Sequence, residues 1–148
     1  MPERLASLVY LDATIGTNGQ SAFSLAPPEI REARMKASKE VDGTRVIFPP
    51  SATFFGLSEP SQVQWVDRRL TPMPFKAYDS PIRLKGPPGG NVPKLFVRCT
   101  KPAIASIEDA AKSARERGWK YVEIDTGHDA MVSAPKELAA ILLDFAKS

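Results

Sequence analysis

The sequence predicts an α/β fold: a three-stranded parallel sheet with flanking helices and a long segment inserted after the first strand. The main observation is that short apolar runs at residues 94–100 and 121–124 alternate with helical patterns that begin near residues 106 and 135. Strands separated by helices favour a parallel sheet with right-handed crossovers. A continuous apolar run at residues 8–11 is too short for a helix, and it predicts another strand, covered on both faces. Three strands make a thin sheet with an unpaired apolar edge, so we expect the chain to be part of a larger fold.

The composition is that of one ordinary soluble globular domain. The chain has 148 residues, of which 43% are hydrophobic and 25% are charged. The formal charge of +3 is modest, and basic residues are interleaved with acidic ones instead of forming a basic stripe. A nucleic-acid partner is therefore not expected.

The single cysteine and the lack of long apolar runs predict a cytoplasmic protein. Cys99 lies inside a predicted strand, and we expect it to be a small buried hydrophobic residue. One cysteine can form no internal disulfide, which favours a reducing compartment. The sequence contains no signal peptide and no run of about 18 apolar residues, so no membrane association is expected.

The middle of the chain, residues 21–93, differs in composition from the rest. It holds most of the 14 prolines, and regular strand patterns are largely missing from it. Pro27 and Pro28 can open a helix that ends before Gly43. Residues 61–70 predict a second short helix, because their apolar residues are three and four positions apart. We expect a helical insertion.

Regular patterns return in residues 94–148. After the strand at 94–100, a Ser106–Asp109 capping box opens a helix that stops at Gly118. The side chains of this helix that we expect to point inward are Ile107, Ala110, Ala111 and Ala114. The last helix is expected to bury Leu138, Ile141, Leu142 and Phe145.

His128 is the only histidine, and its position indicates chemistry. A strand leads through Thr126 and Gly127 to His128, and Pro135 opens the next helix. Loops at the carboxyl end of a sheet carry the chemistry of α/β folds. Histidine is also the side chain best suited to proton transfer near neutral pH. This setting favours a catalytic histidine over a surface or purely structural one.

Four sequence runs resemble the C-terminal half of an α/β-hydrolase. They are Leu8-Val-Tyr-Leu-Asp12-Ala13, Trp65-Val-Asp-Arg-Arg-Leu-Thr71-Pro72, Lys94-Leu-Phe-Val-Arg-Cys-Thr100 and Gly127-His128-Asp-Ala-Met131-Val-Ser133-Ala-Pro135-Lys-Glu-Leu138. The likeness covers essentially the whole chain and is to the esterase branch with plant methylesterases, hydroxynitrile lyases and bacterial relatives. It implies that residues 1–20 supply a sheet-entry strand and the acid loop of the hydrolase core. Residues 21–93 would form a helical, proline-rich cap, and residues 94–148 the last strands and helices with the histidine loop.

The resemblance implies a Ser–acid–His triad without a cofactor or metal. His128 matches the general base, which takes the serine proton and returns it to the leaving group. In the plant branch the acid follows the strand that matches residues 94–100, but the loop there carries no carboxylate in this chain. Some α/β-hydrolases place the acid after an earlier strand, at the position of Asp12, so Asp12 is our candidate. Asp125 stays an alternative, and Asp129 adjoins the histidine and is expected to point elsewhere.

One departure from the family affects the predicted activity. The family nucleophile sits on a Gly-x-Ser-x-Gly turn, and these 148 residues contain no such motif. The backbone donors of the oxyanion hole are missing as well. Because losing one triad member costs several orders of magnitude in rate, we expect a truncated esterase that is inactive alone.

The implied substrate is a small apolar ester. Side chains that could line its pocket, or simply pack the cap onto the body, are Phe48, Phe54, Phe55, Trp65, Met73 and Phe75. Two other readings stay open. The chain could be a non-catalytic binding protein whose bare sheet edge forms a homodimer or holds a partner with the N-terminal half. It could also use His128 for lyase-type proton transfer without a serine.

Overall fold

The computed structural model describes residues 4–147 and confirms the predicted parallel sheet. The sheet consists of β1 (Leu8–Leu11), β5 (Lys94–Cys99) and β6 (Lys120–Ile124), in the order β1-β5-β6. β5 lies in the centre, and all its residues after the first are buried. The parallel registers align the three strands, so their carboxyl ends meet at one edge of the sheet.

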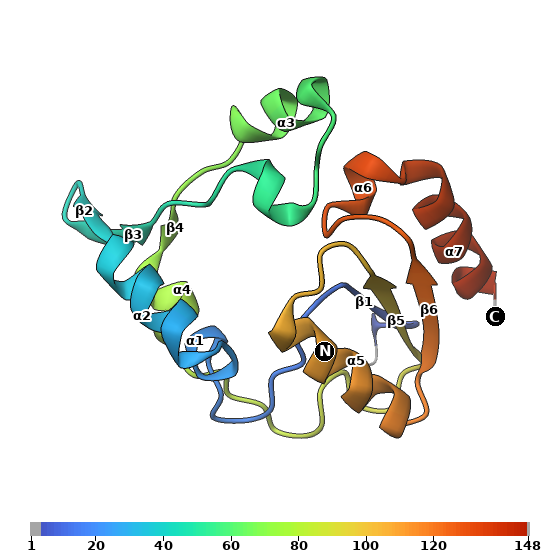
Figure 1. Ribbon diagram of the computed structural model, residues 1–148. Coiled ribbons are helices and arrows are strands. Elements are labelled where there is room, and N and C mark those ends of the chain that lie inside the picture. Colours follow the sequence, from blue (N-terminus) through green and yellow to red (C-terminus); the bar gives the residue numbers. More distant parts are fainter. Residues whose placement is uncertain (1–3, 148) are drawn as a thin grey trace.

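Helices cover both faces of this sheet (Figure 1). α5 (Ala105–Glu116) packs on one face against Phe96, and α7 (Pro135–Lys147) with the short α6 (Ala130–Ser133) packs on the other against Leu95. Successive side chains of a strand point to opposite faces, so β5 supplies residues to both hydrophobic clusters. This layering is why β5 is an almost uninterrupted apolar run in the sequence.

α5 begins differently from the prediction. Its N-cap is Ile104, which makes no side-chain cap hydrogen bond, so the predicted Ser106–Asp109 capping box is wrong. Ser106 lies inside the first turn, where its hydroxyl cannot take the N-cap position. The four predicted inward residues of α5 are all buried, and the helix stops before Gly118, whose φ is 68°.

α7 buries part of the predicted apolar stripe. Leu138 and Phe145 are buried, and Ile141 is partly buried against the same cluster. Leu142 was predicted to be buried, but 38% of its surface is exposed. The stripe runs through Leu138, Ile141 and Phe145, and Leu142 lies at its margin because each residue turns the helix by about 100°.

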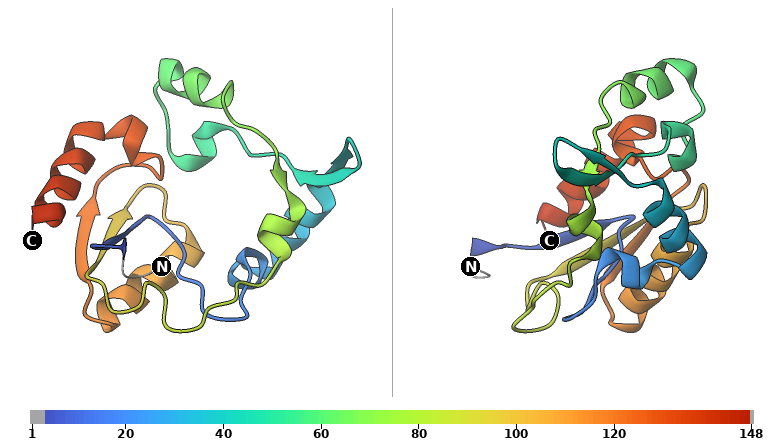
Figure 2. Two further views of the ribbon diagram at one scale, coloured as in Figure 1. Left: turned by 180° about the vertical axis from the view of Figure 1, so that it is seen from behind. Right: turned by 90° about the vertical axis from the view of Figure 1, so that its left-hand side faces the viewer.

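The helices and short strands of the inserted segment, within residues 22–79, lie beside the parallel sheet (Figure 2). Its two predicted helices are confirmed as α2 (Pro28–Ala37) and α3 (Pro60–Asp67), each with a proline in its first turn. The sequence patterns did not reveal α1 (Ala22–Leu25), α4 (Phe75–Asp79) or the 3₁₀ turn η2 (Ala52–Phe55). Each of these is a single turn or little more, too short to give a helical periodicity.

The inserted segment also contains a small antiparallel sheet that the sequence analysis missed. It consists of β2 (Lys39–Val41), β3 (Thr44–Ile47) and β4 (Met73–Pro74), in the order β2-β3-β4. Strands of two to four residues show no alternation, and β4 contains a proline, which argues against a strand.

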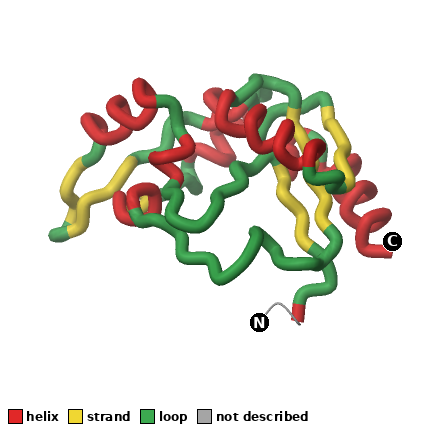
Figure 3. Tube along the Cα trace, turned by 90° about the horizontal axis from the view of Figure 1, so that it is seen from below, coloured by secondary structure: helices red, strands yellow, loops and turns green. Residues whose placement is uncertain are grey.

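Two loops without regular structure connect the inserted segment to the parallel sheet (Figure 3). The loops pair with each other: the Gly19 N–H donates to the Ile82 carbonyl oxygen at 2.9 Å, and the Ile82 N–H donates to the Gln20 carbonyl oxygen at 2.8 Å. The segment therefore leaves and rejoins the body at nearly the same place. None of the helices in the described part of the chain has the length and hydrophobicity needed to cross a bilayer.

The far end of the inserted segment contacts the body a second time. A hydrophobic cluster of Ala52, Leu57 and Val66 packs against Val132 in α6, and the Gln62 side chain donates to the Val132 carbonyl oxygen at 3.3 Å. The segment thus spans from the connecting loops to α6, directly after the histidine loop.

Candidate active site

Asp12 lies directly after β1, at the carboxyl edge of the sheet. Its backbone N–H donates to the Val97 carbonyl oxygen at 2.7 Å, and its φ of 41° turns the chain sharply out of the strand. This left-handed conformation is uncommon for residues other than glycine, although aspartate tolerates it better than most. The turn places the carboxylate over the end of β5, where Oδ1 accepts the Cys99 N–H at 2.9 Å and only 1% of the residue is exposed.

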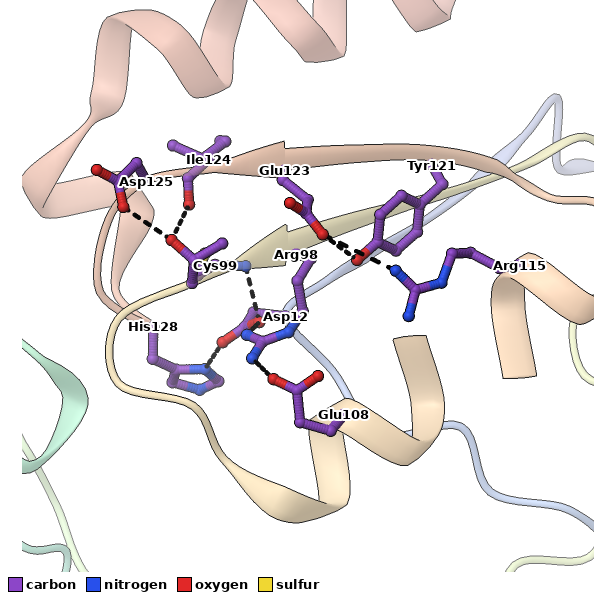
Figure 4. Close-up of polar contacts among 11 residues, drawn as sticks. Asp12, Arg98, Cys99, Glu108, Arg115, Tyr121, Glu123, Ile124, Asp125 and His128 are labelled. Carbon is purple, nitrogen blue, oxygen red and sulfur yellow. Dashed lines mark hydrogen bonds and ion pairs between the residues drawn. The ribbon is translucent and has the colours of Figure 1, made fainter. Parts of the chain in front are cut away.

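His128 reaches the same carboxylate from the loop after β6. Its Nδ1 lies 2.8 Å from Asp12 Oδ2 (Figure 4). Since a carboxylate only accepts, this bond places a proton on Nδ1 and leaves Nε2 as the free nitrogen of the neutral ring. Among residues 4–147, no hydrogen bond engages Nε2, and 31% of the His128 side chain is exposed.

Phe55 of the inserted segment holds the histidine loop from the other side. The His128 N–H donates to the Phe55 carbonyl oxygen at 2.8 Å, and the two rings stack with centroids 5.5 Å apart and planes tilted by 29°. The imidazole is therefore fixed at its backbone, at one ring face and at Nδ1.

The close approach of the two loops requires glycines. A Cβ on Gly127 would lie 2.7 Å from the Phe55 carbonyl oxygen, and one on Gly56 would lie 2.5 Å from the Lys101 carbonyl oxygen. Gly56 also has a φ of 86°, which side chains disfavour. Gly127 belongs to the sequence run that predicted the histidine loop, and the structure gives its physical reason.

A buried guanidinium stands behind Asp12. Arg98 in β5 is 3% exposed, and its Nη1 donates to Asp12 Oδ1 at 2.9 Å. Its Nη2 pairs with Glu108 in the first turn of α5. Burial opposes the charge of Arg98, but the hydrogen bonds and charges of Glu108 and Asp12 outweigh it, so the pKa of Arg98 is raised.

The other acidic residues near the loop have different surroundings. Asp125 accepts hydrogen bonds from Lys101 Nζ at 2.8 Å and Thr100 Oγ1 at 2.9 Å, and these bonds lower its pKa. Both oxygens of Asp125 thus bond to the loop after β5, whereas the carboxylate that bonds to His128 belongs to Asp12. Burial raises the pKa of Asp129, and no hydrogen bond within residues 4–147 joins its carboxylate to the imidazole.

His128 and Asp12 lie at the wall of a cleft of about 810 Å³ between the sheet edge and the inserted segment. Large apolar and aromatic side chains that line it include Phe23, Ile30, Phe54, Phe55, Tyr78 and Ile104. Of the six pocket candidates from the sequence, only Phe54 and Phe55 line this cleft. Phe75 packs against Phe23 behind the cleft wall, and Phe48, Trp65 and Met73 are about half exposed elsewhere.

The sequence analysis missed the remaining wall residues and Arg98. Phe23, Ile30 and Tyr78 come from α1, α2 and α4, whose positions depend on how the inserted segment folds back, and no local pattern encodes that arrangement. Ile104 comes from the loop between β5 and α5. Arg98 did give a signal, because a charged residue in the middle of a buried apolar strand needs a partner. In the part of the chain described, no group of three or more His, Cys, Asp or Glu side chains could hold a metal ion.

The fold is shared with solved structures of hydrolases. An extracellular α/β-hydrolase from a Paenibacillus species superimposes with a TM-score of 0.81 over 97% of this chain and 63% of that one, at 20% identity. The chain folds as the C-terminal half of an α/β-hydrolase. A variant of tomato Methylketone Synthase I in complex with β-ketoheptanoate and a pyrethroid hydrolase also match, both with a TM-score of 0.63 over 99% of this chain, at 16% and 17% identity.

A curated relative is an esterase. The carbendazim hydrolyzing esterase of Nocardioides sp. (strain SG-4G) is 29% identical over 151 residues, which are 92% of this chain and 59% of the esterase. No family model matches the chain. The chain thus spans about three fifths of the length of the α/β-hydrolases that it resembles. The three parallel strands β1, β5 and β6 end at the edge where Asp12 and His128 meet.

Proposed function

We propose that the chain carries the acid and the histidine of a serine-type carboxylic-ester hydrolase. The observation that carries this proposal is the 2.8 Å contact between Asp12 Oδ2 and His128 Nδ1 at the wall of an apolar cleft. In a Ser–acid–His triad the buried acid holds the imidazole in the tautomer with a free Nε2 and stabilises the imidazolium that forms. Asp12 is our acid and His128 our general base.

The cleft favours a small, largely apolar ester as the substrate. Its lining is mainly aromatic and aliphatic, and its volume suits a small molecule. The esterase relative and the hydrolase structures support an ester-hydrolysing role. The inserted segment would act as the cap over the site, because it supplies most of the wall opposite His128.

The 148 residues alone should not hydrolyse esters. They contain no Gly-x-Ser-x-Gly turn, and Ser106 is the serine that lines the cleft. Ser106 lies inside the first turn of α5 and makes no hydrogen bond to His128 among the described residues. A nucleophile and its oxyanion donors would have to come from another segment or another chain.

Two assays of the purified chain test this proposal. We expect no labelling of any serine by a fluorophosphonate probe, and hydrolysis of p-nitrophenyl acetate no faster than by the His128→Ala variant. Stoichiometric labelling of Ser106, abolished in Ser106→Ala, would contradict it, because the chain would then carry its own nucleophile.

A chimera gives the positive test. The part of the Nocardioides esterase outside the matched region is joined to this chain, and hydrolysis is measured once circular dichroism shows a folded product. We expect ester hydrolysis that falls about 10³-fold or more in both His128→Ala and Asp12→Ala. A folded chimera that labels with the probe, yet is insensitive to both substitutions, would rule out the assigned roles.

A non-catalytic, dimerising protein is the second candidate. β1 pairs only with β5 among residues 4–147, so its other edge carries unpaired backbone groups. Light scattering after size exclusion would support this candidate if the chain forms a discrete dimer that binds apolar esters without turnover.

A further inference from the structure

The two oxygens of the Asp12 carboxylate have different partners. Oδ1 accepts from Arg98 Nη1 and from the Cys99 N–H, both at 2.9 Å, while Oδ2 faces His128 Nδ1 at 2.8 Å. Figure 4 shows Asp12 between the imidazole and the guanidinium, with Glu108 beyond Arg98. Two donors on one oxygen prevent the carboxylate from rotating and leave the other oxygen for the histidine.

His128, Asp12, Arg98 and Glu108 form a row of neighbouring ionisable groups, in which the charges alternate once the imidazole is protonated. His128 follows β6, Asp12 follows β1, and Arg98 lies in β5. Asp12 and Arg98 are almost fully buried, whereas about half of the Glu108 side chain is exposed. Charges interact strongly across a buried site, because water screens them little.

We propose that Arg98 is a positioning residue that fixes which oxygen of Asp12 faces His128, and that Glu108, acting through Arg98, sets how readily the imidazole takes a proton. The inference rests on the proposed roles of Asp12 and His128 and extends them to two residues outside the triad. Without Glu108, Arg98 would still pair with Asp12, but the lost negative charge of Glu108 would disfavour the imidazolium. Without Arg98, Asp12 would act on the imidazole at full strength, and the Cys99 N–H would remain as the single donor that holds Oδ1.

Other ionisable groups near the imidazole do not belong to this row. They are Asp129, which follows His128, Glu29 and Arg34 of α2 together with Tyr78 of α4 in the cleft wall, and the buried Cys99 thiol beside Asp12. None of them is altered by a substitution at Arg98 or Glu108. Differences between variants therefore report on the row itself.

The single histidine makes the proposal measurable without any catalysis. Nuclear magnetic resonance follows the titration midpoint of the His128 ring and its Nδ1 proton in the chain as it is. We expect Glu108→Gln to move the midpoint to lower pH, because a negative charge is lost, and Arg98→Met to move it to higher pH, because a positive charge is lost. Arg98→Lys, which keeps the charge, should stay nearer to the wild type than Arg98→Met and lose part of the Nδ1 proton signal.

Controls separate this effect from simple structural damage. Glu116→Gln makes the same change on α5 two turns away, where Glu116 pairs only loosely with Lys112 at 3.9 Å, and should leave the His128 midpoint unchanged. Repeating the series with Asp129→Asn removes the nearest other carboxylate. Should Arg98→Met fail to fold, Glu108→Gln, whose side chain is half exposed, still decides the matter.

Either of two results would overturn the inference. One is a His128 midpoint that agrees within 0.1 unit between the wild type and Glu108→Gln. The other is a midpoint that moves in the same direction in Glu108→Gln and Arg98→Met. Its failure can be told apart from failure of the proposed function. Opposite shifts of the His128 midpoint together with an inactive folded chimera would keep the charge row and remove the esterase role. An active chimera, together with a His128 midpoint that does not move in the variants, would keep the esterase role and remove the charge row.

Discussion

At the scale of single residues, the site depends on two glycines as much as on its charged side chains. Gly127 and Gly56 let the histidine loop and the Phe55 turn approach at backbone distance. This approach allows the Phe55 carbonyl oxygen to accept the His128 N–H and the Phe55 ring to stack on the imidazole. The direction of the His128 ring thus follows from backbone contacts and from Asp12 together.

Replacing Gly127 by alanine should therefore damage both stability and the site. The added Cβ would lie 2.7 Å from the Phe55 carbonyl oxygen, so one of the two loops must move. We expect a loss of about 1–3 kcal/mol in the free energy of unfolding, measured with urea, and a displaced His128 ring resonance. Gly86→Ala is the matched control, because a Cβ there meets nothing within 4 Å, and it should change stability by less than about 0.5 kcal/mol. Equal stability of both variants with an unmoved His128 signal would show that the loop contact is unimportant.

At the scale of elements, the sequence reveals those parts of the fold whose patterns are long enough to read. β5 and β6 are predicted to within one residue, and the inward face of α5 is predicted completely. Burial of β5 on both faces leaves a nearly continuous apolar run, and the buried residues of α5 recur at helical spacing. The antiparallel sheet of the inserted segment escaped prediction because its strands are too short for a period to appear.

The contact between Asp12 and His128 could be anticipated because both follow strands that end at one edge of a parallel sheet. The row behind it could not, since Arg98 and Glu108 meet only once α5 packs on β5.

The two faces of α7 give an element-scale prediction. Leu138 is buried against the sheet, while 62% of Leu143 is exposed. Leu138→Ala should lower the free energy of unfolding by about 2–4 kcal/mol, through lost burial and the cavity left behind. Leu143→Ala, the same substitution on the same helix, should change it by less than about 0.5 kcal/mol. Urea unfolding of both variants at pH 7 decides this. A large loss for Leu143→Ala would mean that the exposed face of α7 is covered in solution.

At the scale of the whole molecule, two groups packed on opposite faces of the sheet keep their protons to higher pH than free side chains do. Burial raises the pKa of the Cys99 thiol to about 12, from an ordinary value of 9.0, and the Asp12 carboxylate adds to this rise. Burial and the neighbouring Glu123 likewise raise the pKa of Tyr121 to about 12. Cys99 lies in the hydrophobic cluster on one face of the sheet and Tyr121 packs against the cluster on the other, so ionising either one opposes the packing on its own face.

The molecule should therefore lose stability in alkali, in a defined order. Between pH 9 and 12 the folded chain holds the Cys99 proton while the unfolded chain releases it, so the free energy of unfolding falls as pH rises. One group contributes a slope of up to about 1.4 kcal/mol per pH unit, and Tyr121 adds its own above pH 10. Urea unfolding is measured from pH 7 to 10.5. The free energy of unfolding should begin to fall near pH 9 in the wild type and only near pH 10 in Cys99→Ala. In Tyr121→Phe the fall near pH 9 should remain, and the added slope above pH 10 should be lost. Parallel stability curves for the wild type and Cys99→Ala would mean that the thiol can ionise in the folded chain, which its complete burial beside Asp12 opposes.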